Sequence, residues 1–298
     1  MIKEAADFIG SEAAKRFVFE MKKRRGSGSF LFVGPDGVGK ASFAKWLIRE
    51  LHDGQLALDP DLFVLEGDES IKIDEIRELT RFISLKAVRS TPKIALIVRG
   101  ERLGLEAANA LLKTLEEPVG ESLIIITATS PELLLPTIVS RCLVVRFGLV
   151  APELLETKLK QEEVDKEKIN RIVYLSGGRV GEALRLARQE GALEEAESSL
   201  EETLELILAS EIERLVRLER GIDSSSLKSY LRKTLWATLL LIESKRAQKP
   251  PLAMEKLGAV SLPRLIKVAS LLEEALLYLS RNQNANLVFG HLLLELGN

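Results

Sequence analysis

The sequence predicts an α/β domain built on a parallel sheet, followed by an all-α part. In the first half, short β-branched and apolar runs alternate with longer amphipathic patterns, which is typical of βαβ units. A glycine-rich loop stands between the first of these runs and the amphipathic pattern that follows it. After Phe147 the strand pattern stops, and the remaining chain has helical periodicity.

The strands of the first half are expected to be buried on both faces of the sheet, because they are apolar along most of their length. They cover residues 29–34, 61–67, 93–100, 122–130 and 142–148. Amphipathic helices are expected between most of them, at about 40–52, 73–86 and 104–117. These elements define a first domain at residues 1–150.

The second half is expected to contain two helical domains. Residues 151–203 hold three short helical patterns, and Gly177 and Gly178 form a helix-stop signal after the second. Residues 204–298 hold longer amphipathic patterns separated by polar and proline-containing segments. The sequence therefore predicts a small helical domain and then a third, all-helical domain.

The composition is that of an ordinary globular protein. The chain has 298 residues, and its 42 Lys and Arg against 44 Asp and Glu give little support to direct DNA binding. A single cysteine, Cys142, excludes an internal disulfide and a cysteine-rich zinc site. The sequence lacks an apolar run of the roughly 20 residues that cross a bilayer, and its N-terminus lacks a signal-peptide core. We expect a cytoplasmic protein without membrane partners.

The glycine-rich loop has the pattern of a phosphate-binding loop. Gly34, Gly37, Gly39 and Lys40 satisfy G-x-x-x-x-G-K directly after a predicted strand and before a predicted helix. Glycines allow backbone N–H groups to curl around an anion, and the start of the helix adds a positive dipole end. These four residues are the candidate nucleotide-binding residues.

The groups that hold magnesium in such loops are missing. Ala41 stands where a Ser or Thr hydroxyl would bind the metal, and Val98 and Arg99 stand where acidic residues would follow the strand. Ser42 is turned away by about 100° on a helix. Glu101 lies roughly 7–10 Å further along an extended chain, out of reach unless the loop folds back.

These absences predict nucleotide binding at most, without hydrolysis, because phosphoryl transfer depends on a metal clamp and a positioned water. Any ATP or ADP in the loop is expected to lack well-coordinated magnesium. Arg99 either neutralises a phosphate in place of the metal or is a solvated or ion-paired arginine.

Two further segments carry a family resemblance. Residues 104–118, GLEAANALLKTLEEP, precede residues 122–142, SLIIITATSPELLLPTIVSRC. Together they resemble the clamp-loader branch of the AAA+ ATPases, as found in bacterial DNA polymerase III. The matched positions are Ala107, Asn109 to Lys113, Leu115 to Pro118, Leu134 to Ile138 and Ser140 to Cys142. Less specific similarity extends over nearly the whole chain.

The resemblance implies a P-loop AAA+ domain, a helical lid domain and a C-terminal helical collar. It also implies that Arg141, after Ser140, is an arginine finger presented in trans to ATP on a neighbouring motor subunit. The implied partners are gamma/tau-like motor subunits and a delta subunit in a hetero-oligomeric ring. The resemblance also implies that this chain acts on the sliding clamp and primed DNA through that complex.

Two departures from the family pattern concern zinc and ATP hydrolysis, and the second, together with Ala41, Val98 and Arg99, favours a subunit that does not hydrolyse ATP. The four-cysteine zinc module of many relatives is absent, so no zinc is implied. Gly181 stands at the position of the lid arginine that touches nucleotide in active motor subunits. An active ATPase with an unconventional metal site, and a nucleotide-sensing interaction protein outside replication, remain alternatives.

Two charged segments also remain open between alternatives. Lys113, Glu116 and Glu117 form either a solvated face or subunit contacts. The basic run of residues 22–25 either touches a DNA phosphate or is solvated at a helix end.

Overall fold

The structure is a computed structural model that describes most of the chain. The described residues are 27–52, 59–67, 70–88, 92–116, 120–210, 213, 224–247, 259–280 and 283–296. The basic run at residues 22–25 lies outside these ranges.

The chain divides into two compact units. The first comprises Met1–Lys158 together with Gly178–Leu184, and the second comprises Leu159–Gly177 together with Arg185–Asn298. Each unit is described by itself. The expected domain boundaries after residues 150 and 203 stay predictions.

The first unit contains the predicted parallel sheet. Its strands are β1 (Gly28–Val33), β2 (Leu62–Leu65), β3 (Lys93–Ile97), β4 (Ser122–Ala128) and β5 (Leu143–Arg146). Their order is β2-β3-β4-β1-β5, and every neighbouring pair is parallel. The prediction of a parallel sheet is therefore confirmed, with β1 between β4 and β5.

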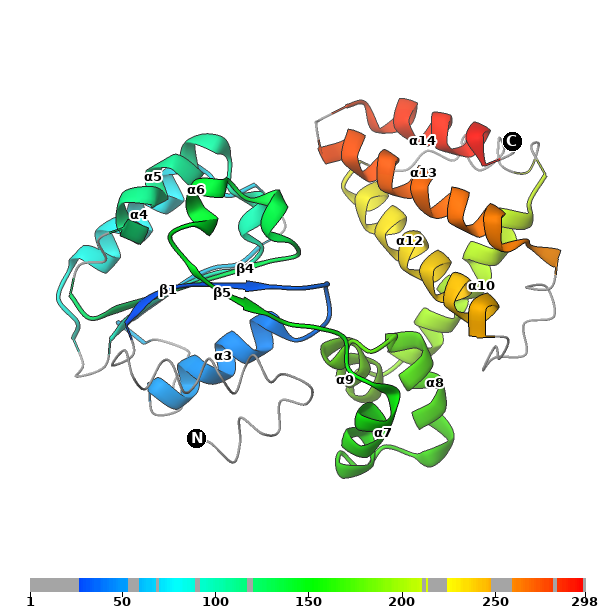
Figure 1. Cartoon of the computed structure of the whole chain (residues 1–298), viewed down its shortest axis with the longest axis horizontal. Helices are drawn as coiled ribbons and strands as arrows, with labels where there is room; N and C mark the ends of the chain where they lie inside the picture. The colour runs from blue at the N-terminus through cyan, green and yellow to red at the C-terminus, as the bar shows by residue number, and fades with distance from the viewer. Residues whose placement is uncertain are drawn as a thin grey trace. The chain divides into compact units, whose positions relative to one another are not determined.

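Helices cover both faces of this sheet (Figure 1). Helix α3 (Lys40–Leu51) lies on one face, and α4 (Ile73–Ser84) and α5 (Leu105–Glu116) lie on the other. Because side chains alternate along a strand, Phe30 and Phe32 of β1 enter the core under α3, whereas Leu31 and Val33 enter the core under α4 and α5. Each such buried side chain contributes about 1.5–3 kcal/mol of transfer free energy.

The parallel arrangement brings the carboxyl ends of the strands to one edge of the sheet. Gly34 follows β1, Val98 follows β3 and Thr129 follows β4 at this edge. Two short elements then lead from β4 to β5, namely η2 (Pro131–Leu133) and α6 (Pro136–Val139). Proline at the first position suits both, because that N–H has no partner inside a helix.

The rest of the described chain is helical. Its helices are α7 (Pro152–Gln161), α8 (Lys166–Ser176), α9 (Val180–Arg188), α10 (Ala192–Leu208), α12 (Ser224–Ala247), α13 (Leu262–Ser280) and α14 (Ala285–Glu295). Within the second unit, α12 packs against α8, α10 and α13, and α14 packs against α13. In the described part of the chain, no helix is both long and apolar enough to span a bilayer.

Helix α8 ends as the glycine pair predicts. Gly177 is its C-cap, with φ 52° and ψ 45°, and its N–H donates to the Tyr174 carbonyl. The same turn packs on α12, where the Trp236 Nε1–H donates to the Leu175 carbonyl at 3.2 Å. A Cβ at Gly177 would lie only 2.7 Å from the Trp236 ring. The turn therefore requires glycine for two reasons: the backbone is left-handed, and a Cβ would clash with the Trp236 ring.

The substitution Gly177→Ala should lower the free energy of unfolding by about 2 kcal/mol or more, because left-handed backbone strain adds to the clash with Trp236. Gly191→Ala is the matched control. Gly191 also has a positive φ, 75°, but an added Cβ there meets no atom within 4 Å. Urea denaturation of the two variants measures the difference, and equal losses would contradict a role for Trp236.

Candidate functional site

The glycine-rich loop joins β1 to α3 at the carboxyl edge of the sheet. Gly34, Gly37 and Gly39 all have positive φ angles, 152°, 79° and 94°. Gly39 is the N-cap of α3, so Lys40 begins the helix. The loop thus has the strand, turn and helix context that the motif predicts.

The ammonium group of Lys40 is directed to the loop's own carbonyls. Its side chain is 8% exposed, and Nζ donates to the carbonyl oxygens of Gly34 at 2.5 Å and Pro35 at 2.8 Å. The Asp36 carboxylate lies 3.9 Å away. Burial lowers the pKa of Lys40; the charges of Asp36 and Glu101 act against this shift, and that of Arg99 adds to it.

The structure places the three degenerate metal positions around this loop and edge. Ala41 is half-buried in the first turn of α3 and offers no oxygen, while Ser42 is exposed. Val98 packs against the core under α3. Arg99 has a left-handed backbone, φ 60°, and its N–H donates to the Thr127 hydroxyl at 3.0 Å. Ala41 and Val98 thus offer no side-chain oxygen at two of these positions.

Glu101 lies closer to the loop than an extended chain would place it. The chain turns back after β3 through Arg99 and the short element η1 (Gly100–Arg102). Glu101 Oε1 accepts a hydrogen bond from the Thr129 hydroxyl at 2.7 Å, and the carboxylate acts on the pKa of Lys40. Its Oε2 is buried without a hydrogen-bond partner in the described part of the chain. The loop does fold back, which was the condition for Glu101 to come within reach.

The first turn of α9 packs directly on the loop. The Glu182 N–H donates to the Gly37 carbonyl at 3.1 Å. A Cβ at Gly181 would stand 2.7 Å from that carbonyl oxygen and 3.3 Å from the Gly39 nitrogen. From the other side, a Cβ at Gly37 would lie 3.4 Å from Arg179 Cδ. An arginine at position 181 therefore has no room in this arrangement.

Sequence reasoning missed Arg179 and Glu182, because the family pattern marks one position, Gly181, for the contact with the loop. The signal for Arg179 is its place immediately before α9, two residues from Gly181. Its side chain lies against Gly37, so the residue before α9 brings an arginine to the glycine-rich loop.

The candidate arginine finger lies on a different part of the same unit. Ser140 is the C-cap of α6, is exposed, and donates its hydroxyl to the Thr137 carbonyl at 3.1 Å. The Arg141 side chain is 29% exposed. Arg141 forms an ion pair with Glu116, the last residue of α5, and donates from Nη1 to the Thr137 carbonyl at 2.9 Å. The structure does not bring Arg141 together with Lys40 through any hydrogen bond or ion pair between described residues.

Cys142 packs against the core under α4 and α5 and is half-buried. Burial raises the pKa of its thiol to about 12. A protonated thiol is a poor nucleophile, so Cys142 serves as a small core residue rather than a reactive one.

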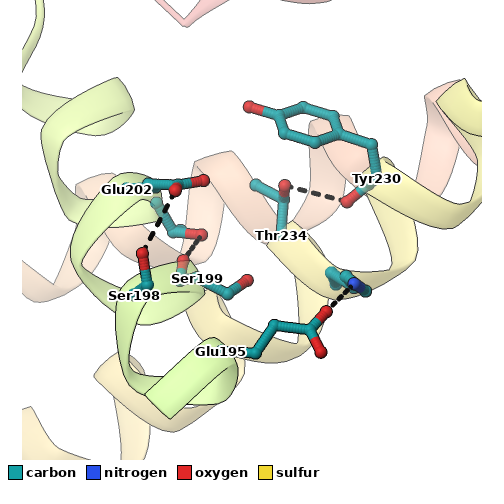
Figure 2. Close-up of a pocket in the computed structure, with 8 residues that line it drawn as sticks. Glu195, Ser198, Ser199, Glu202, Tyr230 and Thr234 are labelled. Carbon is teal, nitrogen blue, oxygen red and sulfur yellow. Dashed lines mark hydrogen bonds and ion pairs between the residues drawn. The ribbon is translucent and has the colours of Figure 1, made fainter. Parts of the chain in front are cut away.

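The second unit has a hollow of about 320 Å³ between α10 and α12 (Figure 2). Several of its polar groups are bonded to one another or to their own helices. Glu195 pairs with Lys233 at 2.6 Å, the Ser198 hydroxyl donates to Glu202 at 3.2 Å, and the Thr234 hydroxyl donates to the Tyr230 carbonyl at 2.9 Å. These contacts leave little polar capacity for a ligand, so the phosphate loop and the Arg141 edge are the stronger candidates.

Comparisons with known proteins find similarity to subunits of DNA polymerase III. Residues 9–150 match the family model described as DNA polymerase III, delta subunit. The delta-prime subunit of Pseudomonas aeruginosa is 33% identical over 54% of this chain and 56% of its own length. The delta-prime subunit of Bacillus subtilis is 30% identical over 57% of this chain and 56% of its own length. Gamma and tau subunits of the same polymerase also match.

The chain spans about half the length of the delta-prime relatives, 56% in both. Among solved structures, a DNA polymerase III gamma subunit-related protein from Thermotoga maritima is similar, with a TM-score of 0.50 and 20% identity. The similarity covers 93% of this chain and 98% of that one. It agrees with the fold class expected from the sequence, namely an α/β sheet domain followed by helical parts.

The contact between α9 and the loop predicts the effect of a small substitution. Gly181→Ala should cost about 1–3 kcal/mol of unfolding free energy, because its Cβ overlaps the Gly37 carbonyl. Amide exchange of residues 180–184 should also become faster. Gly148→Ala is the control, since a Cβ there meets no atom within 4 Å. Equal behaviour of the two variants would mean that α9 does not dock on the loop in solution.

Proposed function

We propose, from the premise that residues 9–150 are those of a delta-prime-like clamp-loader subunit, that this chain works in the DNA polymerase III clamp loader without hydrolysing ATP itself. It supplies Arg141 in trans to ATP on a neighbouring motor subunit. Through the assembled complex it helps to place the sliding clamp on primed DNA during replication.

The observation that carries this proposal is the contrast between two parts of the first unit. The Ser140-Arg141-Cys142 motif is intact, and a partly exposed guanidinium follows the exposed end of α6. The phosphate loop, in contrast, has Ala41 and Val98 at positions that would hold magnesium. A guanidinium suits phosphate oxygens because it is always charged and offers a planar set of donors.

The chemistry of Arg141 is electrostatic. As phosphoryl transfer proceeds, negative charge spreads over the oxygens of the transferred group, and a fixed guanidinium stabilises that charge. Arg141 exchanges no proton in this role. The reacting nucleotide, metal ion and attacking water belong to the neighbouring subunit's site.

The loop of this chain acts, in the proposal, as a weak nucleotide site or as a structural contact. Lys40 already bonds two loop carbonyls, and α9 lies on Gly37. Any bound ATP or ADP is held by loop N–H groups without well-coordinated magnesium. No zinc is needed.

The proposed partners follow the relatives' names and the family resemblance. Gamma/tau-like motor subunits and a delta subunit complete a hetero-oligomeric ring in the cytoplasm, joined through the C-terminal helices. Arg141 lies in the first unit. In the proposed ring, the nucleotide of a motor subunit therefore lies next to the Arg141 surface of this unit.

A second candidate function is an active ATPase, and Glu101 is the observation that favours it. Its carboxylate lies near Lys40, and one of its oxygens is buried without a partner in the described residues. Mg²⁺ sites at bound phosphates often use only one or two carboxylates. Glu101 would then replace the acids missing at Val98 and Arg99.

Replacing the finger tests the first function. Arg141→Ala should leave the complex assembled but slow ATP hydrolysis at the site it serves by about 10³-fold or more, as for arginine fingers in general. The ATPase rate of the reconstituted complex measures this, and total activity falls by that site's share. Arg146→Ala, at an exposed residue of β5, is the control and should keep full activity. Unchanged hydrolysis in Arg141→Ala would refute the finger.

A nucleotide titration separates the two candidate functions. The purified chain should bind fluorescent ADP weakly or not at all, with affinity changed by less than about threefold when magnesium is added, because Ala41 and Val98 supply no metal ligand. Lys40→Ala controls for binding outside the loop. A large gain in affinity with magnesium that Glu101→Gln abolishes, or steady ATP hydrolysis by the isolated chain, would favour the active ATPase.

A further inference from the structure

The guanidinium of Arg141 is held by two neighbouring elements. Its Nε donates to Glu116 Oε1 at 2.7 Å, and its Nη2 also contacts that oxygen. Its Nη1 donates to the Thr137 carbonyl at 2.9 Å and lies 3.5 Å from the Ser140 hydroxyl. The side chain is therefore fixed at one edge by the end of α5 and at Nη1 by α6.

These contacts do not use every donor of Arg141. A guanidinium carries five N–H groups, and Nη2 has two of them. Within the described part of the chain, Glu116 is the only recorded partner of Nη2. A second Nη2 hydrogen therefore remains for a phosphate oxygen, while the edge formed by Nε and Nη2 stays on Glu116.

Stability of α5 does not account for the position of Glu116. A carboxylate at the last residue of a helix faces the negative end of the helix dipole, which is unfavourable. Both side chains are partly exposed, 29% for Arg141 and 48% for Glu116, and ion pairs this exposed contribute little to folding. The pair is better explained by its effect on the orientation of the Arg141 side chain.

We propose that Glu116 is a positioning residue for the arginine finger. It holds the long Arg141 side chain in one rotamer before a phosphate arrives, so less side-chain entropy is lost when the finger engages. This inference rests on the proposed function of Arg141. It adds a third interpretation of Glu116 to the two that the sequence leaves open, namely a carboxylate that bonds Arg141 within its own chain.

The experiment uses the reconstituted clamp-loader complex with the full-length chain. Glu116→Ala should lower kcat at the site served by Arg141 by about tenfold, which corresponds to about 1.4 kcal/mol in the activation barrier. KM for ATP should change little, because the finger acts mainly in the transition state. Glu116→Gln keeps an oxygen acceptor and should recover most of the loss. Glu106→Ala, in the exposed first turn of the same helix, is the control and should be neutral.

A double-mutant cycle distinguishes positioning from a separate structural effect. In the Arg141→Ala background, Glu116→Ala should cause no further loss, because it acts only through the guanidinium. Additive losses, an unchanged rate or an increased rate in Glu116→Ala would each overturn the inference. If Arg141→Ala lowers the rate and Glu116→Ala does not, the positioning role fails alone. If Arg141→Ala has no effect, both the finger and its positioning fail.

Discussion

The burial of the parallel sheet on both faces is the constraint on which the candidate sites depend. Because α3 covers one face and α4 and α5 cover the other, residues at the strand ends meet at one edge. This edge holds the glycine-rich loop after β1, the turn with Glu101 after β3, and Thr129 after β4. The packing of apolar side chains thus fixes which polar groups meet.

Elements with long apolar or amphipathic patterns are the ones that the sequence predicts best. Helix α12 lies within residues 204–298, where longer amphipathic patterns predict helices, and the predicted strand 122–130 contains β4. The predicted strand 93–100 extends beyond β3, which ends at Ile97. The left-handed backbone of Arg99 turns the chain there, and local apolar patterning cannot reveal such a turn. The position of Glu101 depends on that turn.

Contacts between distant segments were the part that residue patterns left open. From the sequence, Gly181 is only a missing arginine. In the structure it has a positive explanation, because only a residue without a side chain fits against the Gly37 carbonyl. Glu116 and Arg141 are likewise 25 residues apart in the sequence, and their ion pair joins the end of α5 to the segment after α6. Such pairs depend on tertiary packing, and residue patterns in one sequence do not predict which distant segments pack together.

Cys142 has a practical consequence for studying this chain. It is the one cysteine of the sequence, and its thiol stays protonated at neutral pH. Maleimides and other alkylating dyes react with thiolates, so the native thiol is slow to take a label. A fluorophore can then be attached at an engineered exposed cysteine while the natural cysteine beside Arg141 is kept, which makes distance measurements possible without rebuilding that motif.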